Sequence, residues 1–201
     1  MKTSNIIIAA TLFAAIVTQS CTKEFSRIEG MGTITTETLY LRDFTGIAVE
    51  GADDVIISYG PEQKVEVTGH PNIIDLIKTD VSNETWYMEL ERGNYGDYEL
   101  TYHITLPFIE KIRCEGSGNV MVSGPMEVET LELSLMGSCN FSGFSMRTQN
   151  CQVDLTGSGN CEITAEKTLD ASLDGSGNVL YKGQPAINVN ISGSGRVIDS
   201  N

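Results

Sequence analysis

The sequence predicts an all-β protein, a β-helix-like solenoid of stacked coils, and three observations carry this prediction. Short alternating apolar and polar runs recur along the 201 residues, separated by turn residues. A turn of the type Gly-Ser-Gly-Asn occurs five times between residues 116 and 196. Its first glycines are 21, 20, 18 and 18 residues apart. A nearly fixed period of this length predicts repeats that stack along one axis.

The repeated turn has a physical reason. A sharp bend needs positive φ angles, which glycine adopts without a Cβ clash and which Asn tolerates better than most residues. We expect the Asn side chains to hydrogen-bond up the stack and the Ser hydroxyls to cap the bent backbone. Cys139 and Arg196 depart from the pattern. The turn positions predicted to be structural are Gly116, Asn119, Gly137, Asn140, Gly157, Asn160, Gly175, Asn178 and Gly193.

The residues around each turn align in apolar rows. Side chains six, four and two residues before the glycine, and four after it, are apolar, whereas those between are mostly polar. Alternate residues of a strand lie on one face, so each coil directs its apolar residues inward. One coil cannot bury that face, so neighbouring coils must build the core together. The row six residues before the glycine consists of Leu131, Cys151, Leu169 and Ile187.

The region before residue 115 is less regular. Short strands are predicted at residues 47–49, 55–57, 65–67, 86–90 and 98–106, and one helical turn at 72–78. Residues 51–54 form a degenerate copy of the repeated turn, 65 residues before Gly116. Residues 92–97 carry an Asn/Gly turn signal, so we expect 86–106 to form an inserted β-hairpin within the same domain.

The N-terminus is predicted to direct export. Lys2 precedes an apolar run at residues 6–17, which is too short to span a bilayer, and Cys21 follows small and polar residues. This pattern is typical of a lipoprotein signal; the alternative is an ordinary secretory signal. We expect residues 1–20 to be a signal peptide, Cys21 to be lipidated, residues 21–40 to be a lipid-anchored tether that is partly disordered near the anchor, and residues 41–201 to be the folded domain.

The charge of the chain excludes one class of function. The formal net charge is −14 and no cluster of Lys and Arg occurs, so nucleic acid is not an expected partner. The expected membrane contact is the lipid anchor rather than electrostatic docking on anionic lipid.

The cysteines leave two interpretations open. Four remain after lipidation of Cys21, an even number that allows two disulfides. However, Cys114, Cys151 and Cys161 occupy apolar rows, where a cysteine acts as a small hydrophobe. Because these positions belong to different rows, core cysteines are favoured over disulfides.

No catalytic residues, metal site or cofactor are predicted. His70 and His103 lack the carboxylate context of a Ser-His-Asp triad, and there is no Cys-x-x-Cys pair. Asp53, Asp54 and Asp174 adjoin glycine turns, but calcium β-rolls have a shorter period and an Asp in each turn. A carbohydrate-active enzyme remains the less favoured alternative, because no paired carboxylates are signalled.

The aromatic residues have two possible roles. They either cover the end of the stack and fill its core, which is favoured, or form a stacking surface for a glycan or protein ligand. The residues concerned are Trp86, Tyr95, Tyr98 and Tyr102, with Tyr87 beside them.

One family shares this ordered combination. The segment Phe44-Thr45-Gly46-Ile47-Ala48-Val49-Glu50-Gly51-Ala52-Asp53-Asp54-Val55, followed by serial Gly-Ser-Gly-Asn turns, resembles the auto-transporter adhesin head GIN domain family of Bacteroidetes lipoproteins. The resemblance covers residues 41–197 and implies a β-helix-like fold at the cell envelope, with no catalytic residues to carry over. We therefore expect a non-catalytic adhesin or binding module that presents a rigid acidic surface at the outer membrane. The alternative is a structural envelope protein that self-associates as a homo-oligomer.

Overall fold

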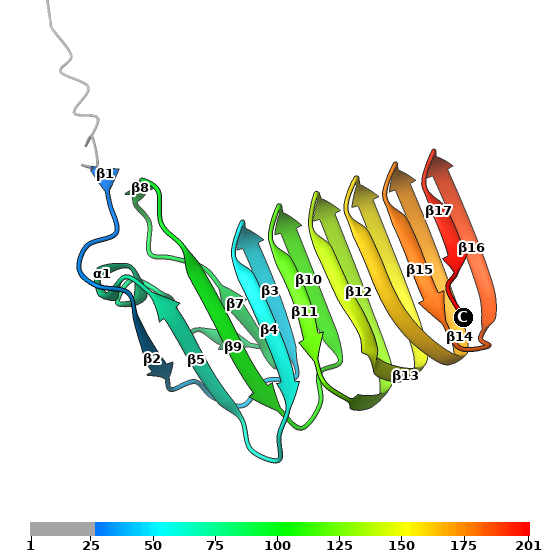
Figure 1. Ribbon diagram of the computed structural model, residues 1–201, viewed down its shortest axis with the longest axis horizontal. Coiled ribbons are helices and arrows are strands. Elements are labelled where there is room, and N and C mark those ends of the chain that lie inside the picture. The colour runs from blue at the N-terminus through cyan, green and yellow to red at the C-terminus, as the bar shows by residue number, and fades with distance from the viewer. Residues whose placement is uncertain (1–26) are drawn as a thin grey trace, which may run out of the picture.

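The computed structural model describes residues 27–201 and is almost entirely β-structure (Figure 1). The predicted signal peptide, Cys21 and the first residues of the tether lie outside the described residues. Within the described part, no helix is long and apolar enough to cross a membrane. The elements are β1 (Arg27–Ile28), β2 (Thr35–Leu39), β3 (Gly46–Gly51), β4 (Asp54–Tyr59), β5 (Lys64–Gly69), α1 (Pro71–Ile74), β6 (Val81–Ser82), β7 (Thr85–Met88), β8 (Asn94–Tyr95), β9 (Leu100–Leu106), β10 (Lys111–Gly116), β11 (Asn119–Ser123), β12 (Met126–Gly137), β13 (Asn140–Gly157), β14 (Asn160–Gly175), β15 (Asn178–Lys182), β16 (Ala186–Gly193) and β17 (Arg196–Asp199).

β1 and β8 form a separate two-stranded sheet, and the other strands form one large curled sheet whose pairs are mostly parallel. Each repeat contributes a layer, and successive layers stand side by side along the long axis in Figure 1. β12 pairs with β13, β13 with β14, and β14 with both β15 and β16. The all-β prediction is confirmed.

The predicted apolar rows are confirmed by the strand registers. Leu131 pairs with Cys151, Cys151 with Leu169, and Leu169 with Ile187. The first three of these side chains are at most 2% exposed. Val120, Phe141, Cys161 and Val179 form a second confirmed row on the other side of the turns. Each layer therefore covers the apolar face of the next, as a stacked repeat requires.

The turns also stack in register. The glycines that open them have φ angles between +90° and +127°, which strain residues that carry a Cβ. In each turn the Ser backbone N–H donates to the Gly carbonyl of the preceding layer, for example Ser158 to Gly137 at 2.8 Å. The hydrogen bond that joins every turn to the one before it is therefore made by the backbone of the Ser residue. A contact between Ser hydroxyls is present between Ser138 and Ser158.

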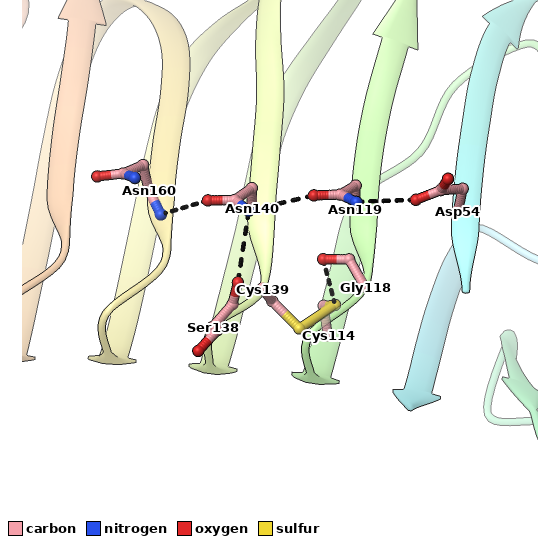
Figure 2. The surroundings of a disulfide bond; sticks show 8 residues. All are labelled: Asp54, Cys114, Gly118, Asn119, Ser138, Cys139, Asn140 and Asn160. Carbon is pink, nitrogen blue, oxygen red and sulfur yellow. Dashed lines mark hydrogen bonds between the residues drawn. A yellow bond between two sulfur atoms is a disulfide. The ribbon is translucent and has the colours of Figure 1, made fainter. Parts of the chain in front are cut away.

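The Asn side chains form the predicted row of hydrogen bonds (Figure 2). Asn119 Nδ2 donates to Asp54 Oδ1 at 2.8 Å, and Asn140 Nδ2 donates to Asn119 Oδ1 at 3.1 Å. The Asn160 backbone N–H donates to Asn140 Oδ1 at 3.0 Å, and Asn178 Nδ2 donates to Asn160 Oδ1 at 3.1 Å. Asp54 therefore occupies the Asn position in the first turn, and Gly51 pairs with Gly116. This confirms that residues 51–54 are a copy of the turn.

The predicted β-hairpin at residues 86–106 is wrong. β7 does not pair with β9; it pairs in parallel with β3, and β9 pairs in parallel with β4. The two strands are therefore one further layer at the N-terminal end of the stack. A local alternating pattern does not distinguish the two arrangements, because it fixes the inward face of a strand and not its neighbour.

The segment predicted to be a tether, residues 21–40, includes residues that pack on the folded domain. β2 pairs antiparallel with β5, and β1 pairs in parallel with β8. Asn72, in the short helix α1, accepts a hydrogen bond from the Met31 N–H at 2.7 Å and donates to the Glu29 carbonyl at 2.8 Å. Residues 27–40 therefore pack on the folded domain. The helix itself falls where one helical turn was expected.

The preference for free cysteines is wrong for one pair. Cys114 and Cys139 form a disulfide with their Cα atoms 6.1 Å apart (Figure 2). Cys114 lies in β10 opposite Leu135, as the rows predict, while Cys139 is in the next turn along the chain. The Cys139 side chain is buried beneath that turn, where it reaches Cys114. Cys151 and Cys161 are free and buried, as expected for core cysteines.

Candidate binding site

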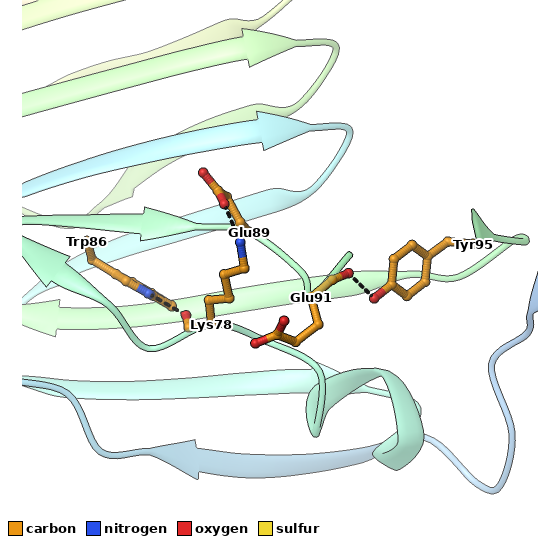
Figure 3. Close-up of polar contacts among 5 residues, drawn as sticks. All are labelled: Lys78, Trp86, Glu89, Glu91 and Tyr95. Atoms are coloured by element: carbon orange, nitrogen blue, oxygen red, sulfur yellow. Dashed lines mark hydrogen bonds and ion pairs between the residues drawn. The ribbon is translucent and has the colours of Figure 1, made fainter. Parts of the chain in front are cut away.

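The structure separates the four candidate aromatic residues into two pairs. Trp86 and Tyr102 are 0% and 1% exposed, and their rings meet edge to face with centroids 5.7 Å apart. Trp86 Nε1 also donates to the Lys78 carbonyl at 3.0 Å (Figure 3). The proposed ligand contact is therefore wrong for these two residues, which fill the core at the N-terminal end of the stack.

Tyr95 and Tyr98 are half-buried and accessible. Their rings meet edge to face with centroids 5.7 Å apart. The Tyr95 hydroxyl donates to the Glu91 carbonyl (Figure 3). This hydrogen bond and the ring contact orient both side chains, which remain candidates for ligand contact.

A cleft forms beside these tyrosines because the first layer lacks the repeated turn. In the second layer, residues 52 and 53 connect β3, which pairs with β7, to β4, which pairs with β9. In the first layer the chain makes the same connection by the longer path of residues 89–99, which includes β8. Because residues 89–99 follow this longer path, no turn stacks against the turn at residues 51–54. Space therefore remains between residues 89–99 and that turn.

The larger hollow at this place has a volume of about 820 Å³. It lies between the turn at residues 51–54, residues 89–99 and the N-terminal segment. The residues that line it are Ile34, Ala52, Asp53, Asp54, His70, Gly96, Asp97, Tyr98, Glu99, Leu100, Thr101 and Asn119. A smaller hollow of about 210 Å³ adjoins it and shares Asp53 and Tyr98, with Tyr95 and Glu50 also in its lining. We call the larger hollow the Asp53 cleft.

Asp53 holds an unusual position in the repeat. It occupies the third position of its turn, where the later turns have Gly118, Cys139, Gly159, Gly177 and Gly195. At each of these glycines an added Cβ would meet the backbone of the preceding turn; at Gly159, for instance, it would meet the Cys139 carbonyl. The first turn has no turn before it, so this position can carry a side chain there.

Asp53 is largely buried, but its carboxylate oxygens reach the solvent of the cleft and accept no hydrogen bond from a described residue. The residue is 9% exposed. Burial, reinforced by the neighbouring Asp54 carboxylate, raises the pKa of Asp53 to about 6. Burial and the Asp53 charge likewise raise the pKa of Tyr98. A buried acid whose pKa is strongly perturbed at a cleft is typical of a functional site.

The ionised Asp53 carboxylate costs stability. Because its pKa rises from 3.8 in the unfolded chain to about 6 in the fold, the folded state binds the proton more tightly. The cost is therefore absent below pH 3.8 and develops as pH rises through about 6. At neutral pH it amounts to at most about 3 kcal/mol, at 1.36 kcal/mol per pKa unit.

Most of the charged side chains that line the Asp53 cleft are acidic. Asp53, Asp54, Asp97 and Glu99 supply carboxylates, and His70 is the one basic side chain among the lining residues. The His70 ring is engaged, because its Nδ1 lies 3.1 Å from the Gly32 carbonyl oxygen. Tyr98 adds an aromatic wall. This arrangement favours a ligand group that donates hydrogen bonds and carries positive charge.

In residues 27–201, no group of three or more His, Cys, Asp or Glu is placed to hold a metal ion. His103 is exposed on β9, opposite Glu66 of β5 and Ile56 of β4, and does not line the Asp53 cleft.

From the sequence, Asp53 was identified only as a carboxylate beside a glycine turn. A stronger signal was present, since Asp53 is the one acidic residue at a position that is otherwise Gly or Cys. Its burial depends on residues 96–101, which the sequence placed in a hairpin. No feature of the sequence marked Asp97 or Glu99 as a candidate site residue.

The fold and this cleft define an all-β repeat domain with a ligand-sized hollow at one end of its stack. Residues 43–144 and 127–185 match the family model described as "Putative auto-transporter adhesin, head GIN domain". The chain therefore belongs to this family, as its motifs predicted. Membership indicates a cell-surface or envelope protein, and the family is named for adhesins, which bind rather than catalyse.

Comparison with solved structures finds one that shares the architecture. A putative adhesin from Bacteroides fragilis is 17% identical, with a TM-score of 0.57 over 86% of this chain and 100% of that one. A putative adhesin from Parabacteroides merdae is 17% identical, with a TM-score of 0.49 over 87% and 99% of the two chains. At these identities the first of the two supports the fold alone. No curated protein gives a significant match to the sequence.

Proposed function

We propose that this chain is a non-catalytic adhesin of the cell envelope whose ligand binds in the Asp53 cleft. In this proposal the stacked layers form a rigid acidic β-solenoid that holds the cleft at its N-terminal end. Family membership supports the adhesin role, and the parallel registers of successive layers support the rigid scaffold. The single observation that carries the location is Asp53, a largely buried residue whose unpartnered carboxylate opens into a cleft of ligand size.

The ligand group proposed for the cleft is a protonated amine. Four carboxylates line the cleft without a Lys or Arg among the lining residues, so an ammonium group would gain charge-assisted hydrogen bonds there. Such a group would also supply the partner that the Asp53 carboxylate lacks. Two sources share this chemistry, an amino sugar of a glycan and a lysine side chain of a protein, and Tyr98 can pack against the apolar part of either.

The Asp53→Asn variant tests the site, because the proposal predicts opposite effects on stability and on binding. Removing the buried charge should raise the free energy of unfolding by about 1–2 kcal/mol at neutral pH, with the difference vanishing below about pH 4. Binding should fall at least about tenfold, because a charge-assisted hydrogen bond contributes about 1.5–3 kcal/mol. Chemical denaturation across pH measures the first effect. An array of amino sugars and lysine-containing peptides, followed by titration, measures the second.

Asp174→Asn is the matched control, since Asp174 is an exposed aspartate directly before a glycine turn far from the cleft. It removes one negative charge with little effect expected on stability or binding. Binding by the unsubstituted chain should also weaken below about pH 6, where Asp53 becomes protonated. Equal binding by Asp53→Asn and the unsubstituted chain would contradict the proposed site. Binding to the amino sugars alone, or to the peptides alone, would identify the source.

The membrane anchor is proposed separately. Cys21 directly follows the predicted signal peptide, so we propose that it is lipidated and holds the domain at the outer membrane. We expect Cys21→Ser to abolish labelling of the protein by a tagged fatty acid. Protease shaving of intact cells then tests surface exposure. Labelling that persists in Cys21→Ser would overturn the anchor.

A further inference from the structure

The C-terminal end of the stack is left open. β16 pairs only with β14, and β17 pairs only with β15, among residues 27–201. Every residue of β16 is exposed, although its apolar side chains continue the buried rows. Ile187, Val189 and Ile191 are 43%, 40% and 42% exposed, whereas their neighbours Leu169, Ala171 and Leu173 in β14 are at most 4% exposed. No layer formed by residues 27–201 covers these three side chains.

β16 also lacks the features that protect an edge strand. Its sequence from Ala186 to Gly193 contains no charged residue and no proline, and both are common devices against edge-to-edge pairing. At the N-terminal end, by contrast, the sheet ends in the short strands β2 and β6, and β2 carries the charged residue Glu37. On a chain with a net charge of −14, the uncharged strand β16 is a place where a second copy can approach with little local repulsion.

The central sequence of β16 is a palindrome. Ile187-Asn188-Val189-Asn190-Ile191 has the same order in both directions. If two copies pair antiparallel about Val189, Val189 lies opposite its own counterpart, and Ile187 lies opposite Ile191 of the second copy. The apolar residues then remain on the inner face of both copies, because directly opposed residues in an antiparallel pair share a face. Asn188 meets Asn190 of the second copy on the outer face.

We propose that β16 is a dimerisation edge, which joins two copies end to end by antiparallel pairing of the two β16 strands. The arrangement continues the sheet across a two-fold axis, covers the three exposed apolar rows and pairs the free backbone groups of the edge. Because this two-fold pairing uses the same edge of both copies, it leaves no second β16 edge free and the assembly closes at two. The Asp53 clefts then lie at the two outer ends of the dimer, so each dimer presents two clefts.

Two matched double variants test this register. In Asn188→Lys/Asn190→Lys, each introduced lysine faces another lysine of the second copy, so the dimer dissociation constant should rise about tenfold or more. In Asn188→Lys/Asn190→Glu, each introduced lysine faces an introduced glutamate, so the dimer should persist. Both variants lose the hydrogen bond from Asn188 to Asp170 equally. Sedimentation velocity over a wide concentration range, on residues 21–201 with Cys21→Ser, measures each dissociation constant.

The outcomes separate the alternatives. A monomeric unsubstituted chain at all concentrations would overturn the proposal, as would a Lys/Lys variant that dimerises as tightly as the unsubstituted chain. Loss of the dimer in both variants would overturn the antiparallel register, because parallel pairing opposes like charges in both. Amine binding at the Asp53 cleft is measured at the other end of the molecule, so its failure would leave the dimer result standing.

Discussion

Gly157→Ala is expected to lower the free energy of unfolding by at least about 3 kcal/mol, or to prevent folding. Gly157 has a φ of +124°, which strains any residue with a Cβ. The added Cβ would also lie far inside van der Waals contact with the Gly137 carbonyl oxygen. That oxygen accepts the hydrogen bond from the Ser158 N–H that joins the two layers. The layers would have to separate there, and chemical denaturation measures the cost.

Gly51→Ala is the matched control for this prediction. Gly51 has a similar φ of +112°, but an added Cβ meets nothing within 4 Å, because no turn precedes it in the stack. Its cost should therefore be the backbone strain alone, about 1–2 kcal/mol. Equal losses in the two variants would show that close approach between layers does not limit these positions.

Reduction of the Cys114–Cys139 disulfide is expected to lower the free energy of unfolding by about 3 kcal/mol, from the lost constraint on the unfolded chain. The two cysteines are 25 residues apart and join neighbouring layers. Cys151 and Cys161 should stay unreactive while the protein is folded, because burial raises the pKa of the Cys151 thiol to about 12 and that of the Cys161 thiol as well. Denaturation with and without reductant measures the difference.

The Cys114→Ser/Cys139→Ser variant is the control, since reductant should not change its stability. Alkylation of the unfolded, unreduced chain should modify Cys151 and Cys161 but neither Cys114 nor Cys139. If the unsubstituted chain loses no stability on reduction, or if Cys114 and Cys139 are alkylated without reductant, the disulfide is absent in solution.

The cysteines show which side-chain positions could be predicted from the sequence and which could not. Periodicity placed Cys114 beside Leu135 and Cys161 beside Val179, and both pairings are present. Cys139 lies in a turn, where alternation no longer fixes the direction of a side chain. Its approach to Cys114 depends on the path of the turn between two layers, which only the assembled stack defines.

The first layer shows a second limit. The inward faces of β7 and β9 could be predicted, as the burial of Trp86 and Tyr102 shows. Their partners could not, because a hairpin and a parallel layer both satisfy the same alternation. The Asp53 cleft depended on this difference: a hairpin would have paired the strands on either side of residues 89–99, whereas the parallel layer sends this segment on a detour past the turn at residues 51–54.

The sequence by itself determined the repeat register, the glycine turns, the Asn row and the buried rows, because each follows from the local geometry of a strand or a turn and recurs in every layer. Only the tertiary structure decided which cysteines pair, that Tyr95 and Tyr98 remain accessible, and that Asp53 lies unpartnered in a cleft. These features depend on which layers come together at the N-terminal end of the stack. There the repeat is broken, and its period carries no information about the contacts.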